Sequence, residues 1–212
     1  VANSAFSARR FARLTGNSAQ VLPPILEFDV FAVDRRGEAA IFVNPIGKKG
    51  VEIVLRLAEA RPDAPIQIFE SWGLSETWRA RCQERFAGLD NVLWRPACDD
   101  PQEIFGQARL LLMPSVWEES YGRTVAEAQV SGVPTLASDR GALPDQVGEG
   151  GLCVSVGAED DAWRGAFDAL WDDHEVYARC SAGALRRSDA RRGEVADGLA
   201  QFEALLGEIA GR

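Results

Sequence analysis

Short apolar runs alternate with segments of helical pattern through most of this chain, and no other feature constrains the fold as strongly. Apolar runs bounded by turn residues are typical of strands that are buried on both faces of a sheet. We expect strands at 40–43, 66–69, 91–94, 109–113, 135–137 and 152–156, and helices at 50–60, 75–87, 100–107 and 124–130. Because alternating strands and helices pair through right-handed crossovers, the sequence predicts an α/β fold: a Rossmann-like open parallel sheet with helices on both faces.

The chain beyond residue 158 is expected to consist of C-terminal helices. Arginines at positions 186, 187, 191 and 192 lie there among acidic residues. We therefore expect them to form a solvated helix face rather than an anion site. The apolar stripe at the end of this segment, which includes Phe202 and Leu206, is expected to be partly unpartnered.

A strand, a loop and a helix follow one another around Pro114. The run 109–113 is apolar after Arg109, Pro114 opens a loop, and the helical segment 124–130 stops at Ser131-Gly132, a plausible C-terminal cap. The start of such a helix presents unpaired N–H groups and the positive end of its dipole at the carboxyl edge of the sheet. A phosphate can bind there.

Two glutamates frame this phosphate position. Glu119 lies in the loop, and Glu127 lies about one turn inside the helix. Carboxylates repel phosphate but accept hydrogen bonds from hydroxyl groups, so a fitting ligand carries a diphosphate between two hydroxyl-bearing groups, as a sugar nucleotide does. A glutamate near a helix start also complements the dipole without binding any ligand, and Glu127 alone fits that explanation as well.

These residues resemble the donor site of the family 4 retaining glycosyltransferases, which have the GT-B fold. The central pattern is Pro114-Ser115, Glu119, Tyr121-Gly122 and Glu127-Ala128. The segments 131–138 and 141–152 are similar to the family's small-residue turn, next strand and Gly-Gly-x-Pro-Glu-x-Val element. The segment 43–51 is similar to its strand-loop-helix element with a Lys-Gly pair. The resemblance spans about residues 1–170.

The resemblance implies roles for particular side chains. Glu119 and Lys49 are expected to be catalytic: Lys49 would neutralise charge on the departing phosphate, and Glu119 would orient the sugar hydroxyls. Lys48 stands beside Lys49, and without the family pattern the sequence does not decide which of them points into the site. The expected donor-binding residues are Tyr121, Gly122, Arg123, Thr124, Glu127, Asn44 and Arg95.

Two positions depart from the family pattern. Asn44 stands where many members carry an arginine that holds the diphosphate, and a charged hydrogen bond of this kind contributes about 1.5–3 kcal/mol. Arg123 is a candidate substitute. The glycine-rich turn after the second strand is replaced by Glu70-Ser71-Trp72-Gly73. Arg95, after the third strand, is the expected contact to the base.

The implied reaction is glycosyl transfer with retention of configuration from a nucleotide-diphosphate sugar. The N–H groups around Gly122 and Thr124, together with Lys49, would stabilise the leaving phosphate. Neither a metal nor a cofactor is expected in this design.

The resemblance also divides the chain. Residues 1–24 are expected to be the remnant of an N-terminal acceptor domain with the interdomain linker, and residues 25–212 the C-terminal nucleotide-sugar-binding domain with terminal helices. The acceptor, a sugar, a lipid or a small molecule, would sit on the missing domain, so we expect this fragment to be inactive alone. We expect a cytoplasmic protein, and peripheral attachment to the inner membrane face stays open.

Composition argues against several other classes. The net charge of −9 makes a nucleic-acid partner unexpected, because no basic stripe is present to displace counterions. The four cysteines fit no zinc pattern and are expected to be free thiols. The single histidine, His174, lies in an acidic helical run and is expected on a solvated surface. No G-x-G-x-x-G sequence follows the first strand, which disfavours a dinucleotide oxidoreductase.

Two alternatives stay open. One is a different GT-B enzyme, such as a sugar-nucleotide epimerase or a phosphorylase, although the Tyr121-Gly122 pair between the glutamates argues against it. The other is a non-catalytic nucleotide-binding domain. The fold alone does not separate these functions.

Overall fold

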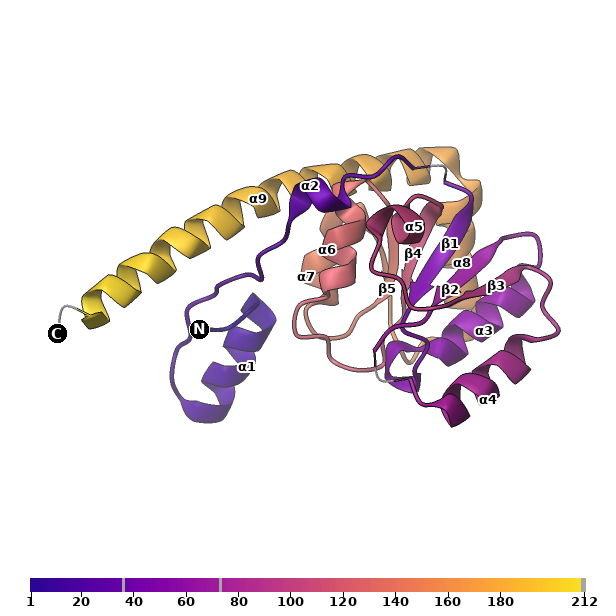
Figure 1. Cartoon of the computed structure of the whole chain (residues 1–212), viewed down its shortest axis with the longest axis horizontal. Helices are drawn as coiled ribbons and strands as arrows, with labels where there is room; N and C mark the ends of the chain where they lie inside the picture. The colour runs from indigo at the N-terminus through magenta and orange to yellow at the C-terminus, as the bar shows by residue number, and fades with distance from the viewer. Residues whose placement is uncertain (36, 73, 211–212) are drawn as a thin grey trace.

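The computed structural model describes residues 1–35, 37–72 and 74–210, with side chains up to residue 207. A six-stranded parallel sheet with the strand order β3-β2-β1-β4-β5-β6 forms its centre (Figure 1). The strands are β1 (Ala39–Val43), β2 (Ile66–Phe69), β3 (Val92–Arg95), β4 (Ala108–Met113), β5 (Thr135–Ser138) and β6 (Gly151–Val154). Each predicted strand overlaps one of these, and the predicted fold class is confirmed. From β1 the next two strands are added on one side of the sheet and the strands from β4 onward on the other, so the strand order reverses between β1 and β4. Ligands of open α/β sheets bind at such a reversal.

Helices cover both faces of the sheet. One face carries α3 (Val51–Ala60), α4 (Glu76–Phe86) and α8 (Asp160–Asp172). The other carries α2 (Phe28–Phe31), α5 (Pro101–Phe105), α6 (Arg123–Val130) and α7 (Leu143–Val147). Two 3-10 turns, η1 (Gly47–Lys49) and η2 (Gly148–Gly150), follow β1 and α7. The short helices α2 and α7 were not predicted.

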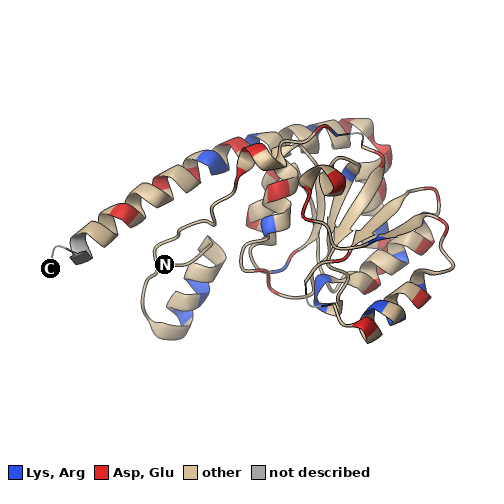
Figure 2. Ribbon diagram, viewed as in Figure 1, with Lys and Arg blue, Asp and Glu red and all other residues tan. Residues whose placement is uncertain are grey.

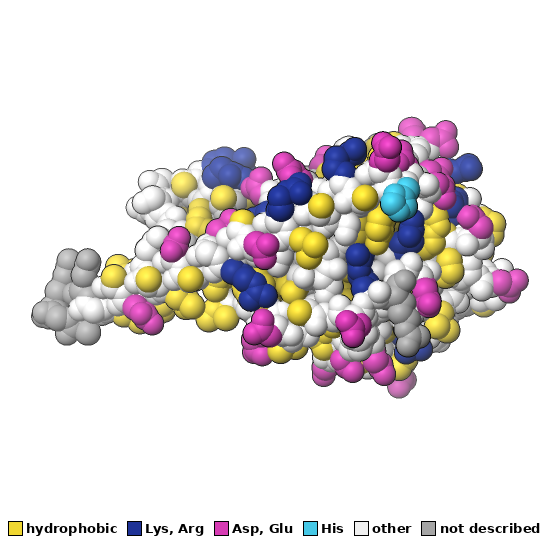
Figure 3. Space-filling model, turned by 90° about the horizontal axis from the view of Figure 1, so that it is seen from above, with side chains coloured by type: hydrophobic (Ala, Val, Ile, Leu, Met, Phe, Trp, Pro, Cys, Tyr) yellow, Lys and Arg dark blue, Asp and Glu magenta, His cyan; other side chains and the backbone are white. Residues whose placement is uncertain are grey.

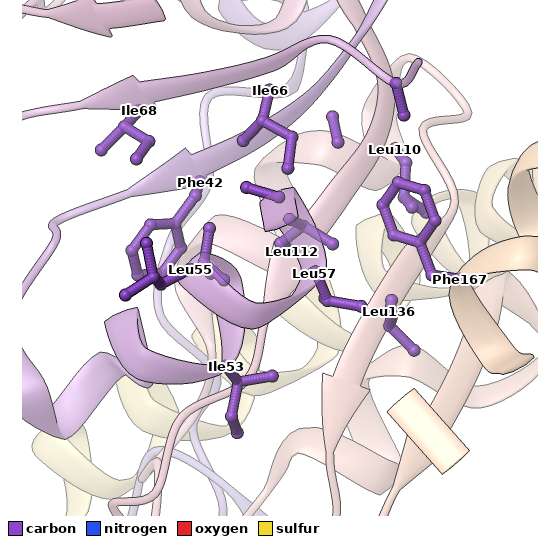
Figure 4. Packing of buried hydrophobic residues seen from close by; sticks show 14 of the residues in the cluster. Phe42, Ile53, Leu55, Leu57, Ile66, Ile68, Leu110, Leu112, Leu136 and Phe167 are labelled. Atoms are coloured by element: carbon purple, nitrogen blue, oxygen red, sulfur yellow. The ribbon is translucent and has the colours of Figure 1, made fainter. Parts of the chain in front are cut away.

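The two-residue period of the strands separates the core into two layers. Ala40 and Phe42 of β1 point to the layer under α3 and α8, while Ala39 and Ile41 point to the layer under α5, α6 and α7. Figure 4 shows the first layer, in which side chains of α3 and Phe167 of α8 pack against the central strands. Burial on both faces explains why these strands are continuous apolar runs rather than alternating ones.

The N-terminal segment forms its own small unit beside the sheet domain. Helix α1 (Ala5–Thr15) begins at Ser4, whose hydroxyl accepts a hydrogen bond from the Ser7 N–H, and it ends at Gly16 in the left-handed conformation. Ala2 pairs with Val21 in a parallel bridge. No residue of α1 is buried. The expected origin of residues 1–24 in another domain stays a prediction.

The chain closes with one long helix, α9 (His174–Ala210). Its first half packs against α6, α8 and η2, and its far end projects past the sheet beside the N-terminal segment (Figure 1). There the Gln20 amide donates a hydrogen bond of 2.7 Å to Gln201. Leu206 is half exposed, and Figure 3 shows hydrophobic side chains along this projecting end, as expected for a partly unpartnered stripe.

The prediction that the four arginines form a solvated helix face is wrong for Arg191. Arg191 is fully buried, and its guanidinium donates hydrogen bonds of 2.9 and 3.0 Å to the side-chain oxygens of Gln129 and Gln146. Both glutamines are distant from Arg191 in sequence, and their side chains accept hydrogen bonds from part of the buried guanidinium. The pattern of residues within one helix does not predict such contacts. Arg186, by contrast, is exposed, as predicted.

Charges of both signs are spread along the helices (Figure 2). His174 is exposed at the start of α9, which confirms the predicted surface position (Figure 3). Among the described helices, none is both long enough and apolar enough to span a bilayer.

Candidate functional site

The carboxyl ends of β1, β2, β3 and β4 surround a cavity of about 580 Å³. Its walls come from the loops after these strands, the start of α6 and one side of α5. The predicted residues that line it are Lys49, Glu119, Tyr121, Gly122, Arg123, Thr124 and Glu127. Most of the predicted site is therefore brought together at one edge of the sheet, at the strand-order reversal.

The start of α6 forms the floor of this cavity. Gly122 precedes the helix in the left-handed conformation, with φ 84°, and its carbonyl accepts the N–H groups of Val125 and Ala126. A Cβ atom at Gly122 would lie 2.9 Å from the Leu143 side chain, so glycine is required both by space and by backbone conformation. The N–H groups of Arg123 and Thr124 belong to the first helical turn, where no intrahelical acceptor exists.

Lys49 and Glu119 form an ion pair inside the cavity. The Lys49 Nζ lies 2.6 Å from Glu119 Oε1, with the side chains 21% and 12% exposed. The Ser115 hydroxyl donates a second hydrogen bond of 2.7 Å to the same oxygen. Ser115 is itself fully buried, and its carbonyl accepts a hydrogen bond from the Ser138 hydroxyl at the end of β5. Glu119 is thus held from two sides.

Of the two adjacent lysines, Lys49 faces the cavity. Gly50 has φ 84°, and a Cβ atom there would lie 1.9 Å from the Pro114 carbonyl oxygen, so the loops after β1 and β4 are in close contact. In this arrangement Lys49 lines the cavity, whereas the Lys48 Nζ lies 4.5 Å from the ring centroid of Trp117.

Arg123 and Glu127 form a second ion pair along α6. The Arg123 Nε donates a hydrogen bond of 2.8 Å to Glu127 Oε1, one helical turn away. The Glu127 side chain is 17% exposed, whereas that of Arg123 is 59% exposed. Burial raises the pKa of Glu127 above its ordinary value, and the Arg123 guanidinium only partly opposes this shift. The carboxylate is therefore poorly solvated and available to accept hydroxyl hydrogen bonds.

Tyr121 serves the packing of this loop as well as the cavity wall. Its side chain is buried with Leu26, Phe28 and Ala126, so that it connects α2 to α6. Burial raises the pKa of its hydroxyl.

Asn44 and Arg95 lie outside the cavity. Asn44 is 4% exposed and adopts φ 67°, and within the described chain neither polar atom of its amide has a hydrogen-bond partner. The Arg95 guanidinium lies over the Phe69 ring, and its Nη2 is 3.9 Å from Glu103. Their predicted donor contacts thus find no support in the placement of these two side chains.

The structure adds residues that the sequence did not single out. Ser4 and Ser7 of the N-terminal segment donate hydrogen bonds to the Ser120 carbonyl, and Arg10 pairs with Glu118, so this segment braces the loop that carries Glu119. Trp72 and Cys98 line the cavity at the end formed by the loops after β2 and β3. All four cysteines are free, as predicted, and burial raises the pKa of the Cys98 thiol.

A second cavity, of about 440 Å³, lies between the N-terminal segment, α7 and α9. Its charged lining consists of Asp145, Glu194, Asp197 and Arg187. This net negative balance disfavours a diphosphate there.

Known proteins resemble this chain both in sequence and in fold. A D-inositol 3-phosphate glycosyltransferase from Corynebacterium glutamicum is 36% identical over 149 residues, which cover 65% of this chain and 35% of the relative. A protein of the same name from Corynebacterium kroppenstedtii is 29% identical over 140 residues, covering 60% of this chain and 31% of the relative. The chain thus spans about a third of the length of these curated relatives.

Solved structures share the fold at low sequence identity. The Anabaena protein HepE, in a crystal structure with UDP, has a TM-score of 0.82 at 18% identity, with 98% of this chain and 63% of that chain covered. Sucrose-phosphate synthase from Thermosynechococcus elongatus has a TM-score of 0.81 at 17% identity, with coverages of 98% and 58%. A family model described as glycosyl transferases group 1 matches residues 27–187, and the chain therefore belongs to this glycosyltransferase family.

Proposed function

We propose that this chain is the donor-binding half of a retaining glycosyltransferase that uses a nucleotide-diphosphate sugar. The observation that carries the proposal is the meeting of Lys49, Glu119 and the start of α6 in one cavity. A lysine and unpaired helix N–H groups bind an anion, while Glu119 and Glu127 accept hydroxyl groups on either side of it. The crystal structures of HepE with UDP and with UDP-glucose support a uridine nucleotide as the first donor to test.

The ion pair indicates how the donor binds. The Lys49 ammonium is paired with Glu119, 2.6 Å away. A diphosphate carries more charge than one carboxylate and draws the lysine toward itself, which frees Glu119 to accept sugar hydroxyls. Ser115 keeps the carboxylate in place during this exchange, because its hydrogen bond does not depend on the lysine.

The catalytic contribution of this half is electrostatic. As the bond between sugar and diphosphate breaks, negative charge grows on the leaving phosphate, where Lys49 and the N–H groups of Arg123 and Thr124 stabilise it. The acceptor hydroxyl attacks from the same face of the sugar, so the configuration is retained. These groups supply the positive charge without a metal ion. Glu127 holds the ribose, and the acceptor binds to a separate N-terminal domain. The four free thiols support a reducing, cytoplasmic setting.

Calorimetric titration of the chain with UDP, GDP, ADP and dTDP tests the proposal. We expect one nucleotide to bind saturably and equally well in Mg²⁺ and in EDTA. Lys49→Ala should weaken binding about tenfold, the effect of one charged hydrogen bond, whereas the matched control Lys48→Ala should bind as the wild type does.

Four outcomes would contradict the proposal. Binding that requires Mg²⁺ overturns the metal-independent design, and equal effects of the two lysine variants overturn the role of Lys49. Sugar transfer by the chain alone would show that the acceptor does not need another domain. Failure of all four nucleotides to bind would remove the donor-site assignment.

A further inference from the structure

An exposed tryptophan, Trp72, lies at the donor cavity. Trp72, in the turn after β2, is 76% exposed, and it lines the same cavity as Lys49 and Glu127. Tryptophan contributes most when its large apolar face is covered, so an exposed one beside a cavity indicates a surface that a ligand covers.

The turn that carries Trp72 starts from a fixed point. Glu70, the first residue after β2, is 11% exposed, and its Oε1 accepts hydrogen bonds of 2.7 Å from Arg79 Nε and from the indole N–H of Trp94. These bonds connect the end of β2 to α4 and to β3. The turn is therefore anchored at its first residue, two positions before Trp72, which reduces the entropy lost on binding.

The cavity has two chemically different ends. The end formed by β1, β4 and α6 carries Lys49, Glu119 and Glu127. The end formed by the loops after β2 and β3 and by α5 carries mainly apolar groups, together with Ser71 and Asp99; the apolar groups come from Trp72, Cys98, Pro101, Ile104 and Phe105. Because β3 and β2 lie on the far side of β1 from β4, this apolar end extends away from the phosphate position.

We propose that Trp72 stacks on the nucleobase of the donor, an inference that rests on the proposed function. With the diphosphate at Lys49 and the ribose at Glu127, the base is the remaining part of a nucleoside diphosphate, and it is the part with an aromatic face. The indole supplies affinity through stacking, while Ile104 and Phe105 cover the apolar surroundings of the base. The turn after β2, which is rich in glycine in the resembled family, thus carries a side chain that stacks on the base in this chain.

Trp72→Ala tests this contact, because a side chain exposed to this degree is not needed for folding. Trp117 offers a matched control: it is 55% exposed at the same edge of the sheet, but it contacts Lys48 and does not line the cavity. The chain is titrated with UDP, GDP, ADP and dTDP and, in parallel, with inorganic pyrophosphate and glucose 1-phosphate.

We expect Trp72→Ala to raise the Kd of the tightest-binding nucleotide about 5- to 100-fold, the range for loss of one stacked base. Pyrophosphate and glucose 1-phosphate should bind equally well before and after the change, and Trp117→Ala should match the wild type throughout. Trp72→Phe should keep most of the affinity, because a phenyl ring still stacks. Nucleotide binding should quench the tryptophan fluorescence of the wild type but not that of Trp72→Phe.

The failures of the two proposals are distinguishable. A wild-type chain that binds no nucleoside diphosphate overturns both. Unchanged nucleotide affinity in Trp72→Ala overturns the stacking contact alone. An equal loss of glucose 1-phosphate affinity would assign Trp72 to the sugar instead of the base, and an equal loss of pyrophosphate affinity would show only a general disturbance of the cavity.

Discussion

Gly141 fixes the backbone of the loop that carries Glu119, and Gly141→Ala removes that fit. Gly141 has φ +65°, and an added Cβ atom would lie 2.2 Å from the Glu119 carbonyl oxygen and 2.5 Å from its amide nitrogen. Ordinary contact begins near 3.4 Å, so the two loops must separate by about 1 Å. The adjacent hydrogen bond of 2.8 Å from the Ala142 N–H to the Glu119 carbonyl would be lost or stretched.

The expected loss of stability combines two costs. The left-handed conformation costs a residue with a Cβ atom about 1–2 kcal/mol, and overpacking a well-packed site costs about 1–3 kcal/mol. A total loss of about 2–5 kcal/mol corresponds to a fall of about 4–20 °C in Tm for a domain of this size. A displacement of about 1 Å at Glu119 also disturbs the sugar position, where such shifts reduce rates up to about 100-fold.

Thermal unfolding followed by circular dichroism measures the first effect, and the affinity for UDP-glucose relative to UDP measures the second. Gly88→Ala is the control, because Gly88 has no neighbouring atom within 4 Å and needs no positive φ, so its Tm should stay the same or rise slightly. If Gly141→Ala melts with the wild type and shows the same ratio of UDP-glucose to UDP affinity, the close contact between these loops does not hold Glu119.

Three further variants probe individual side chains. Glu127→Gln should weaken nucleotide binding yet leave the chain as stable or more stable at pH 7. Burial raises the pKa of Glu127 in the folded state, so the wild type loses stability relative to the variant as the pH rises above 4.5. Urea unfolding at pH 4 and pH 7 measures this difference. Arg61→Met should remove part of the loss of stability that the wild type shows in acid. Hydrogen bonding to Arg61 lowers the pKa of Asp63 to about 2, so the stability that this ionised carboxylate contributes disappears as the pH falls from 3.8 toward 2. Parallel acid-unfolding curves of the two proteins would contradict this. Ser115→Ala removes one of the two hydrogen bonds to Glu119 Oε1, so UDP-glucose affinity should fall about fivefold while UDP affinity is retained, and calorimetry with both ligands decides it.

The sequence predicted the scaffold well because the central strands are buried on both faces. The runs around Ile41 and Leu111 therefore had to be mainly apolar, and that requirement is visible without knowledge of any contact. The loop from Pro114 to Gly122 was likewise predictable, because a strand followed by a loop and a helix places the N–H groups of the helix start at the sheet edge.

Other features depend on partners that are distant in sequence. The burial of Arg191 is accompanied by hydrogen bonds to two glutamines from α6 and α7, and Lys49 rather than Lys48 lines the cavity where the loops after β1 and β4 are in close contact. Asn44 is buried outside the cavity, with φ 67°, although the family pattern places this position at the donor. Local periodicity contains no information on such contacts. The exposed position of Trp72 beside the cavity is of the same kind, because it depends on where the turn after β2 comes to lie.

The pairing of the two proposed catalytic residues with each other has a consequence for selectivity. Lys49 and Glu119 satisfy one another in the absence of a ligand, and Ser115 supports the carboxylate alone. A free hexose offers hydroxyls to Glu119 but no anion to Lys49, so it must compete with a half-buried ion pair and leaves the lysine uncompensated. A diphosphate sugar replaces both partners at once, because its phosphate takes the lysine while its hydroxyls take the carboxylate. If Lys49 and Glu119 act as proposed, we expect the ion pair to discriminate against free sugars and to favour a donor that carries both groups on one molecule.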